Sequence, residues 1–148
     1  MDNIFENFTI SILKLNKLVN KIKVHEMREY GLKAIHTMCI YYLGLNPDGG
    51  LTSSELARLT LEDKAAISRG LALLVEKGYV TYDQNKYGAK IYLTDSGKQL
   101  AKDVNDKCER AVSAGSAIKT EEELIFFYKA LNAISKNLQE YYNSLTEE

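Results

Sequence analysis

The sequence predicts a mainly α-helical fold with one small β-hairpin. Apolar residues recur at steps of three and four along most of the chain, which is the spacing of one helical face. Proline occurs only once in 148 residues, and a single pair of short β-prone segments flanks a polar loop. A chain of this length suits one domain with its own hydrophobic core, covering residues 1–148.

The composition excludes several classes of protein. With 19 basic and 20 acidic side chains the formal net charge is −1, which excludes a highly basic nucleic-acid coat and an acidic disordered tail. The N-terminus lacks the basic and apolar regions of a signal peptide, and the longest apolar run, residues 38–43, is too short to cross a bilayer. We therefore expect a cytoplasmic protein that does not act at a membrane.

Helices are predicted at both ends of the chain, over residues 2–25 and from residue 121 onward. Thr120 and Glu123 form a capping box at the start of the last helix. Each helix carries an unbroken apolar stripe, which can interlock with a symmetry mate or pack within one subunit. The residues expected in a dimer interface are Phe5, Phe8, Ile12, Leu124, Phe127, Leu131, Ile134, Leu138 and Tyr141.

Three helices are predicted between the first helix and the hairpin. One covers residues 30–43, ends at Gly44 and is apolar on most faces, which indicates a buried helix. The next begins after Thr52, which forms a capping box with Glu55, and the third covers residues 63–77 and is stopped by Gly78. The inner stripe of the third helix is Ile67, Leu71, Leu74 and Val75, which leaves Lys64, Ala65, Ser68 and Arg69 facing outward.

The hairpin is predicted from strands at residues 79–82 and 90–93, joined by the polar loop 83–89. Thr94 then caps a long helix whose inner positions are Leu100, Val104, Cys108 and either Ala111 or Val112. Two short capped helices with a tight link, followed by a hairpin, form a winged helix-turn-helix. The second short helix of such a unit can enter the major groove of DNA. The hairpin, residues 79–93, is called the wing below.

Four blocks of the sequence resemble the MarR (multiple antibiotic resistance regulator) family of bacterial transcription regulators. They are residues 51–57 (LTSSELA), 63–69 (DKAAISR), 76–80 (EKGYV) and 93–97 (LTDSG), in the family's order and spacing. The resemblance implies a six-helix fold in which residues 1–48 and 99–148 supply the core and dimerisation helices. Residues 49–98 would form the winged DNA-binding lobe. It further implies a homodimer that binds a pseudo-palindromic operator in double-stranded DNA.

The resemblance also implies which residues meet DNA. Arg69 can make a bidentate contact to guanine or hold a phosphate, and Lys64 suits a phosphate. Ala65 and Ala66 stand where the family often has hydroxylated residues, so they offer only apolar contact. The full set expected at DNA is Thr52, Ser53, Ser54, Lys64, Ala65, Ala66, Ser68, Arg69, Asn85, Lys86, Tyr87 and Lys90.

The wing departs from the family pattern. Residues 85–88 (NKYG) fall where many members carry Asp-x-Arg-Gly, so Asn85 and Tyr87 replace the charged pair. Lys86 and Lys90 are then the only cations of the wing. Residues 49–98 hold seven basic and six acidic side chains, a net charge of +1, which predicts modest non-specific affinity and a shallow salt dependence.

The sequence offers residues for two kinds of sensor site, one for a metal or a thiol reaction and one for a small organic molecule. A metal or thiol sensor would draw on His25, His36, Cys39 and Cys108, but no HxxxH or CxxC spacing is present. Both cysteines lie on apolar stripes, which is typical of core residues, so we expect no cofactor, zinc included. A small phenolic or aromatic effector is the other option, in a crevice that Phe8, Tyr30, Tyr41, Tyr42 and Phe126 could line.

No sequence motif indicates an enzyme, since GxSxG, GxxxxGK[ST] and GxGxxG are all absent. The sequence therefore predicts a ligand-responsive, homodimeric repressor that binds a specific operator. Two alternatives stay open. One is a metal- or thiol-sensing regulator of the same fold, and the other is a dimeric scaffold that has lost operator recognition.

Overall fold

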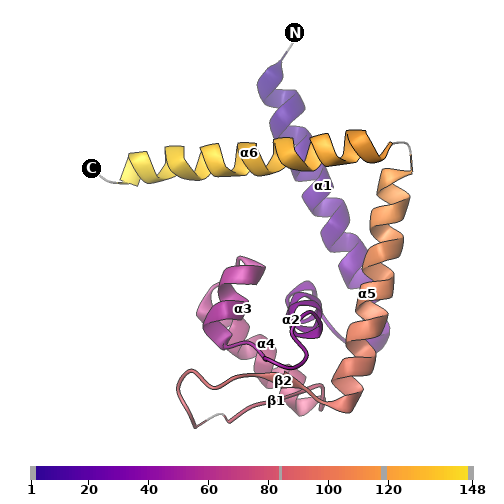
Figure 1. The fold of residues 1–148 in the computed structure, drawn as a ribbon, viewed down its shortest axis with the longest axis vertical. Coiled ribbons are helices and arrows are strands. Elements are labelled where there is room, and N and C mark those ends of the chain that lie inside the picture. Colours follow the sequence, from indigo (N-terminus) through magenta and orange to yellow (C-terminus); the bar gives the residue numbers. More distant parts are fainter. Residues whose placement is uncertain (1–2, 84, 118–119, 147–148) are drawn as a thin grey trace. The chain divides into compact units, whose positions relative to one another are not determined.

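The computed structural model describes residues 3–83, 85–117 and 120–146 (Figure 1). These residues form six α-helices, one short 3₁₀ helix and one two-stranded antiparallel sheet, in the order α1, η1, α2, α3, α4, β1, β2, α5, α6. The chain divides into two compact units, residues 1–109 and residues 110–148. The predicted class, a mainly helical winged helix-turn-helix, is confirmed.

The segment from α1 to α2 differs from the prediction in one place. α1 covers Ile4–Glu26, and η1 (Arg28–Tyr30) follows it. α2 covers Ala34–Gly44, so the predicted helix start at residue 30 is wrong by four residues. The reason is Gly31, which ends η1 in the left-handed region at φ +63°. A new helix then begins after Lys33, whose backbone N–H donates to His36 Nδ1 at 2.9 Å.

The helix-turn-helix has the predicted boundaries to within a residue. α3 covers Ser53–Thr60 and α4 covers Lys64–Glu76. The Asp63 carboxylate caps α4 by accepting from Ala66 N at 2.7 Å, which satisfies one of the free N–H groups of the first turn. Leu61 makes the turn between the two helices in the left-handed region, at φ +58°, with 92% of its surface exposed.

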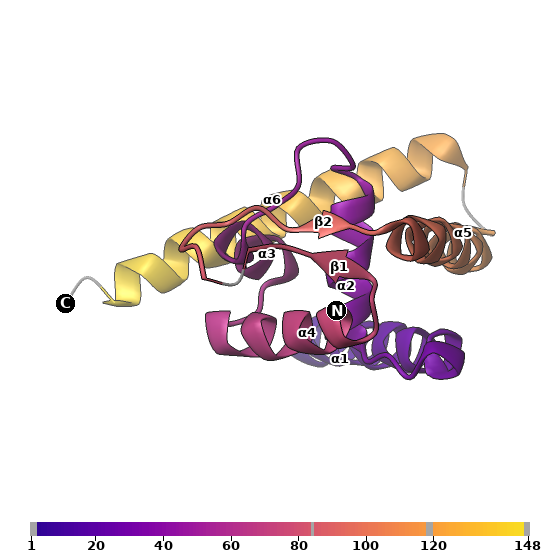
Figure 2. The same ribbon diagram turned by 90° about the horizontal axis from the view of Figure 1, so that it is seen from below.

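The wing is shorter in its regular part than predicted. β1 is Val80–Thr81 and β2 is Tyr92–Leu93, paired with Val80 opposite Leu93. Ile91, the residue before β2, instead forms an isolated antiparallel bridge with Leu51, which lies just before α3. Figures 1 and 2 both show the loop of the wing projecting on the side away from α5, which covers Asp95–Ser116.

A single hydrophobic core unites α2, α3, α4, the wing and the first half of α5. Its side chains come from each of these elements, and the predicted inner stripe of α4 is buried within it, apart from the half-buried Val75. The largest fully buried side chains are Met27, Ile40, Leu43, Leu56, Ile67, Leu71, Leu74, Ile91 and Val104. This core holds the helix-turn-helix and the base of the wing in one body.

A cluster of charges joins α5 (Asp95–Ser116) to the last residue of α1 and to η1. The Lys107 ammonium is 2.9 Å from the Glu29 carboxylate, 3.3 Å from Glu26 and 3.6 Å from Asp103, with only 13% of its side chain exposed. Tyr30 donates to Asp103 at 2.9 Å, and this hydrogen bond is the main cause of a raised tyrosine pKa. Tyr30 thus belongs to this cluster.

The second unit is dominated by α6, which covers Glu121–Thr146. The predicted capping box at its start is present, since Thr120 N donates to Glu123 at 2.9 Å and Glu123 N donates to Thr120 Oγ1 at 3.3 Å. No described residue of α6 is buried, although the helix is rich in large apolar side chains. Among the described residues, no helix has the length and apolar character needed to cross a lipid bilayer.

Candidate functional site

The exposed face of α4 lies opposite the residues that anchor this helix in the core. Ile67, Leu71 and Leu74 are buried on the inner face of α4. The opposite face of the helix carries four exposed side chains. This outer face of α4 consists of Lys64, Ala65, Ser68 and Arg69, as predicted, whereas Ala66 is half-buried. The face therefore offers two cations, a hydroxyl and a methyl group on a rigid, capped helix.

The start of α3 offers fewer free groups than expected. Thr52 is occupied in a capping box, because Glu55 N donates to its hydroxyl oxygen at 3.2 Å and its own N–H donates to the Glu55 carboxylate at 2.7 Å. Ser53 and Ser54 are exposed and keep their hydroxyls free of the cap. Of the three predicted phosphate contacts in this turn, two are therefore available to a ligand.

The tip of the wing is fully accessible. Asn85, Lys86 and Tyr87 are all exposed, and Tyr87 has 98% of its surface open to solvent. Within the described part of the loop, Lys86 N donates to Asp83 O and Ala89 N donates to Lys86 O, both at 3.2 Å. Gly88 has φ +69°, a turn conformation that costs glycine little. The tip thus presents an aromatic ring beside one cation.

Lys90 is engaged within the protein. Its ammonium lies 3.0 Å from Glu55 Oε2, so the wing is tied to the first turn of α3. Hydrogen bonds from the Thr52 backbone N–H, which has the largest effect, from Lys90 and from the Thr52 hydroxyl together lower the pKa of Glu55 to about 2. The carboxylate is therefore ionised at any pH near neutrality. Sequence reasoning missed this pair because its members are 35 residues apart.

Two of the weak metal candidates lie in the packing beneath α4 and α3. Cys39 is fully buried, and burial, with a smaller contribution from Glu62, raises the pKa of its thiol to about 12. His36 is buried, and a Cβ placed on Gly70 of α4 would lie 3.5 Å from its ring. His25 is exposed, and Cys108 is half-buried with a pKa raised by burial. Within residues 3–83, 85–117 and 120–146, no three His, Cys, Asp or Glu side chains form a metal-binding group.

The buried His36 predicts a pH dependence of stability. Burial lowers its pKa from 6.5, with further lowering from the nearby Lys33 and Lys77 charges. The unfolded chain therefore takes up a proton near pH 6.5 while the folded chain resists it. The contribution of neutral His36 to the free energy of unfolding is fully present above that pH. Below it, the free energy of unfolding decreases by at most about 1.4 kcal/mol per pH unit. Urea unfolding at about pH 7.5 and about pH 5.5, on either side of the ordinary histidine pKa, measures the loss.

His36→Gln is the matched variant for this measurement. Glutamine can accept the same Lys33 N–H in a capping box but does not titrate. We expect its urea midpoint to change less between the two pH values than that of the unsubstituted chain. Equal changes in the two proteins would contradict the assignment to His36.

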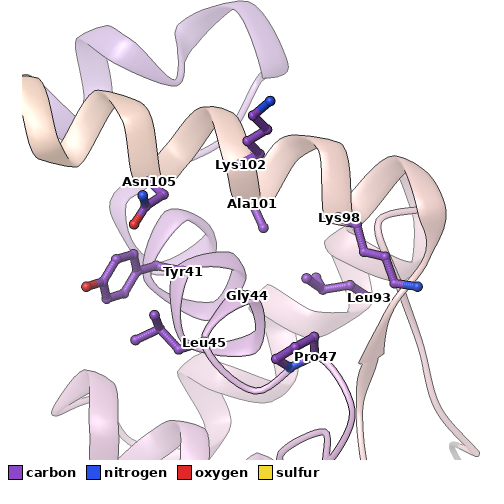
Figure 3. Close-up of a pocket in the computed structure, with 9 residues that line it drawn as sticks. All are labelled: Tyr41, Gly44, Leu45, Pro47, Leu93, Lys98, Ala101, Lys102 and Asn105. Carbon is purple, nitrogen blue, oxygen red and sulfur yellow. The ribbon is translucent and has the colours of Figure 1, made fainter.

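One cavity lies between α2, the loop after it and α5 (Figure 3). It has a volume of about 400 Å³, and Leu45, Pro47, Leu93 and Ala101 give it apolar walls. Tyr41 and Asn105 bring polar groups to one side, while Figure 3 shows Lys98 and Lys102 extending from α5 with their ammonium groups pointing away from Pro47. Of the five aromatic residues considered for an effector crevice, Tyr41 lines this cavity.

The terminal helices leave their predicted stripes uncovered in the single chain. Phe8 and Ile12 of α1 are exposed, and so are Phe127, Leu138 and Tyr141 of α6. Leu124, Leu131 and Ile134 are half-buried, and the side chain of Phe5 lies outside the described residues. Contiguous apolar surface of this extent on a helix is typical of an interface.

Comparison with known protein families gives a match to the segment that contains α3 and α4. A family model described as MarR family matches residues 30–86, which run from η1 to the wing. No curated protein sequence matches the chain.

Solved structures resemble the whole fold at low sequence identity. A MarR protein from Peptoclostridium difficile is 22% identical with a TM-score of 0.83, and the match covers 98% of this chain and 95% of that one. The transcriptional regulator SlyA is 19% identical with a TM-score of 0.80, over 93% and 98% of the two chains. An S. aureus MepR–DNA complex is 16% identical with a TM-score of 0.78, over 88% and 97%.

Proposed function

We propose that the protein is a sequence-specific DNA-binding transcriptional regulator of the MarR family, whose model matches residues 30–86. The observation that carries the proposal is the outer face of α4, where exposed Arg69 and Lys64 stand on a helix held rigidly by its buried stripe. A helix fits the major groove, and an arginine there can distinguish guanine from other bases. A protein of similar fold, MepR, has been solved with DNA.

We further propose that the active form is a homodimer joined through α1 and α6. The support is the exposed apolar stripe on each helix, which leaves residues such as Phe8 and Leu138 in water in the single chain. A twofold dimer would present two α4 helices to half-sites about one helical turn apart, so the operator would be pseudo-palindromic.

Titration of DNA tests the regulator proposal directly. The probe is the duplex immediately upstream of the protein's own coding region, followed by fluorescence anisotropy at two salt concentrations, with a random duplex of equal length as control. We expect the upstream duplex to bind more tightly, as one dimer per site in sedimentation velocity. The salt dependence should be shallow, because residues 49–98 carry a net charge of only +1. Equal binding of the two duplexes at low salt would overturn the proposal.

Ligand response and repression form the finer part of the proposal. A small phenolic or aromatic effector would occupy the cavity beside Tyr41, whose volume of about 400 Å³ falls within the usual range for small-molecule sites. The cavity lies between α2 and α5, so a bound effector would change how these two helices pack. It would thereby favour a dimer geometry in which the two α4 helices no longer match their half-sites. Release of the bound upstream duplex by simple phenols, blocked by Leu45→Trp, is the expected result.

A dimeric scaffold without operator recognition is the second candidate. The observations that favour it are the methyl group of Ala65 on the outer face of α4 and the engagement of Lys90 by Glu55, both of which reduce the groups available to DNA. The same titration separates the two candidates. A scaffold would form the dimer and show no preference among duplexes.

A further inference from the structure

Lys90 and Glu55 connect the two parts of the lobe that must act together on DNA. Lys90 precedes β2 at the base of the wing, and Glu55 lies in the first turn of α3. Their 3.0 Å contact is a salt bridge between side chains that are 43% and 40% exposed. In a sequence this pair looks like one free wing cation and one helix cap, but in the structure each is the other's partner.

The carboxylate of Glu55 has two tasks at a single oxygen. Its Oε2 accepts from Thr52 N at 2.7 Å, from Thr52 Oγ1 at 2.9 Å and from Lys90 Nζ at 3.0 Å. The first two bonds close the capping box of α3, and the third reaches the wing. The position of the wing cation is therefore set by an oxygen that the helix cap has already fixed.

A backbone contact next to the ion pair gives the junction a second attachment. Leu51 N donates to Ile91 O at 3.2 Å, and Ile91 N donates to Leu51 O at 2.8 Å. Leu51 and Ile91 are both buried, and each is the sequence neighbour of a member of the polar contact, Thr52 and Lys90. Two attachments at adjacent residues restrict rotation of the wing about its base, which one attachment would allow.

We propose that Lys90 is a positioning residue that fixes the wing on α3 through Glu55, so that α4 and the wing tip meet DNA as one rigid surface, and that it makes no phosphate contact of its own. This inference rests on the proposed DNA-binding function. It assigns the direct wing contacts to the tip, where Lys86 and Tyr87 are exposed.

A double-mutant cycle with a salt titration tests the proposal. The variants are Lys90→Met, Glu55→Gln and the two together, and glutamine keeps the capping box because it can accept the same hydrogen bonds. We expect each single change to weaken binding of the upstream duplex about threefold, the size typical of an exposed ion pair, and the double change to add nothing more. The slope of log affinity against log salt should stay unchanged in all three.

Lys86→Met is the matched control for the salt titration, since it removes an exposed cation from the same wing. It should lower the salt slope by about 0.9 per protomer, the value for one lost phosphate contact. If Lys90→Met lowers the slope by that amount while Glu55→Gln leaves affinity unchanged, Lys90 binds phosphate and the proposal is wrong.

Hydrogen exchange of the Ile91 amide gives a readout that does not need DNA. Loss of the ion pair should speed exchange about threefold in Lys90→Met and in Glu55→Gln alike, with no further increase in the double variant. A protein that binds no duplex would refute the proposed function yet still show this pattern. Unchanged exchange in both single variants would overturn the positioning role itself.

Discussion

Arg69→Ala is expected to remove sequence-selective DNA binding while leaving the fold and the dimer unchanged. The Arg69 side chain is exposed on the outer face of α4, and within the described residues it takes part in no hydrogen bond or ion pair. Its truncation therefore has little structural effect. A bidentate arginine–guanine contact contributes about 1–3 kcal/mol of discrimination, and a dimer has two of them, so we expect a loss of about 100-fold or more against the upstream duplex.

The measurement compares anisotropy titrations with the upstream duplex and a random duplex, and adds sedimentation velocity for the dimer. Lys102→Ala, which removes an exposed cation from α5, is the control and should bind as the unsubstituted protein does. Lys64→Ala should weaken both duplexes alike, because a phosphate contact carries no sequence information. If Arg69→Ala keeps its preference for the upstream duplex, base recognition lies elsewhere in the lobe.

Features that depend on a few neighbouring residues could be predicted from the sequence. The capping boxes at Thr52 and Thr120 are present, and Gly78 follows α4 with φ +74°. The outer face of α4 followed from the helical period alone, because the buried stripe fixes which side remains in water. These elements need only local hydrogen bonds and the direction of the core.

The errors arose where distant residues decide the structure. α2 begins later than its pattern suggests for two reasons. The Tyr30 side chain, which suits the helical spacing, donates a hydrogen bond to Asp103 of α5, and Gly31 has a positive φ that interrupts the helix. The wing strands are shorter than predicted because Ile91 pairs with Leu51 rather than with β1. The ion pair between Lys90 and Glu55 could not be predicted for the same reason, since nothing near Lys90 in the sequence indicates Glu55 as its partner.

Gly97 in the first turn of α5 is expected to tolerate no side chain. A Cβ at this position would overlap the carbonyl oxygen of Tyr79 and lie 3.2 Å from Leu93 Cδ2. The carbonyl cannot easily move away, because it accepts a hydrogen bond from Thr94 N at 3.0 Å. Thr94 in turn donates through its hydroxyl to Gly78 O at 2.6 Å and accepts from Gly97 N at 3.1 Å.

These bonds place Gly97 where the first turn of α5 meets Tyr79 at the base of the wing and Gly78, which follows α4. Forcing in a methyl group must break the Thr94 contacts or shift the backbone of Tyr79, so Gly97→Ala should destabilise the protein by about 3 kcal/mol. In thermal unfolding this corresponds to a Tm lower by about 10 °C.

Gly115→Ala is the matched control, because Gly115 lies in the same helix and, apart from the neighbouring backbone of that helix, nothing lies within 4 Å of the place that a Cβ would take there. At this position the methyl group meets open space and only the higher helix propensity of alanine acts, which should raise stability by up to about 1 kcal/mol. The two substitutions are chemically identical and should have opposite signs. If both raise Tm, the packing of Gly97 against Tyr79 is looser than the structure requires, and the wing is not anchored at this point.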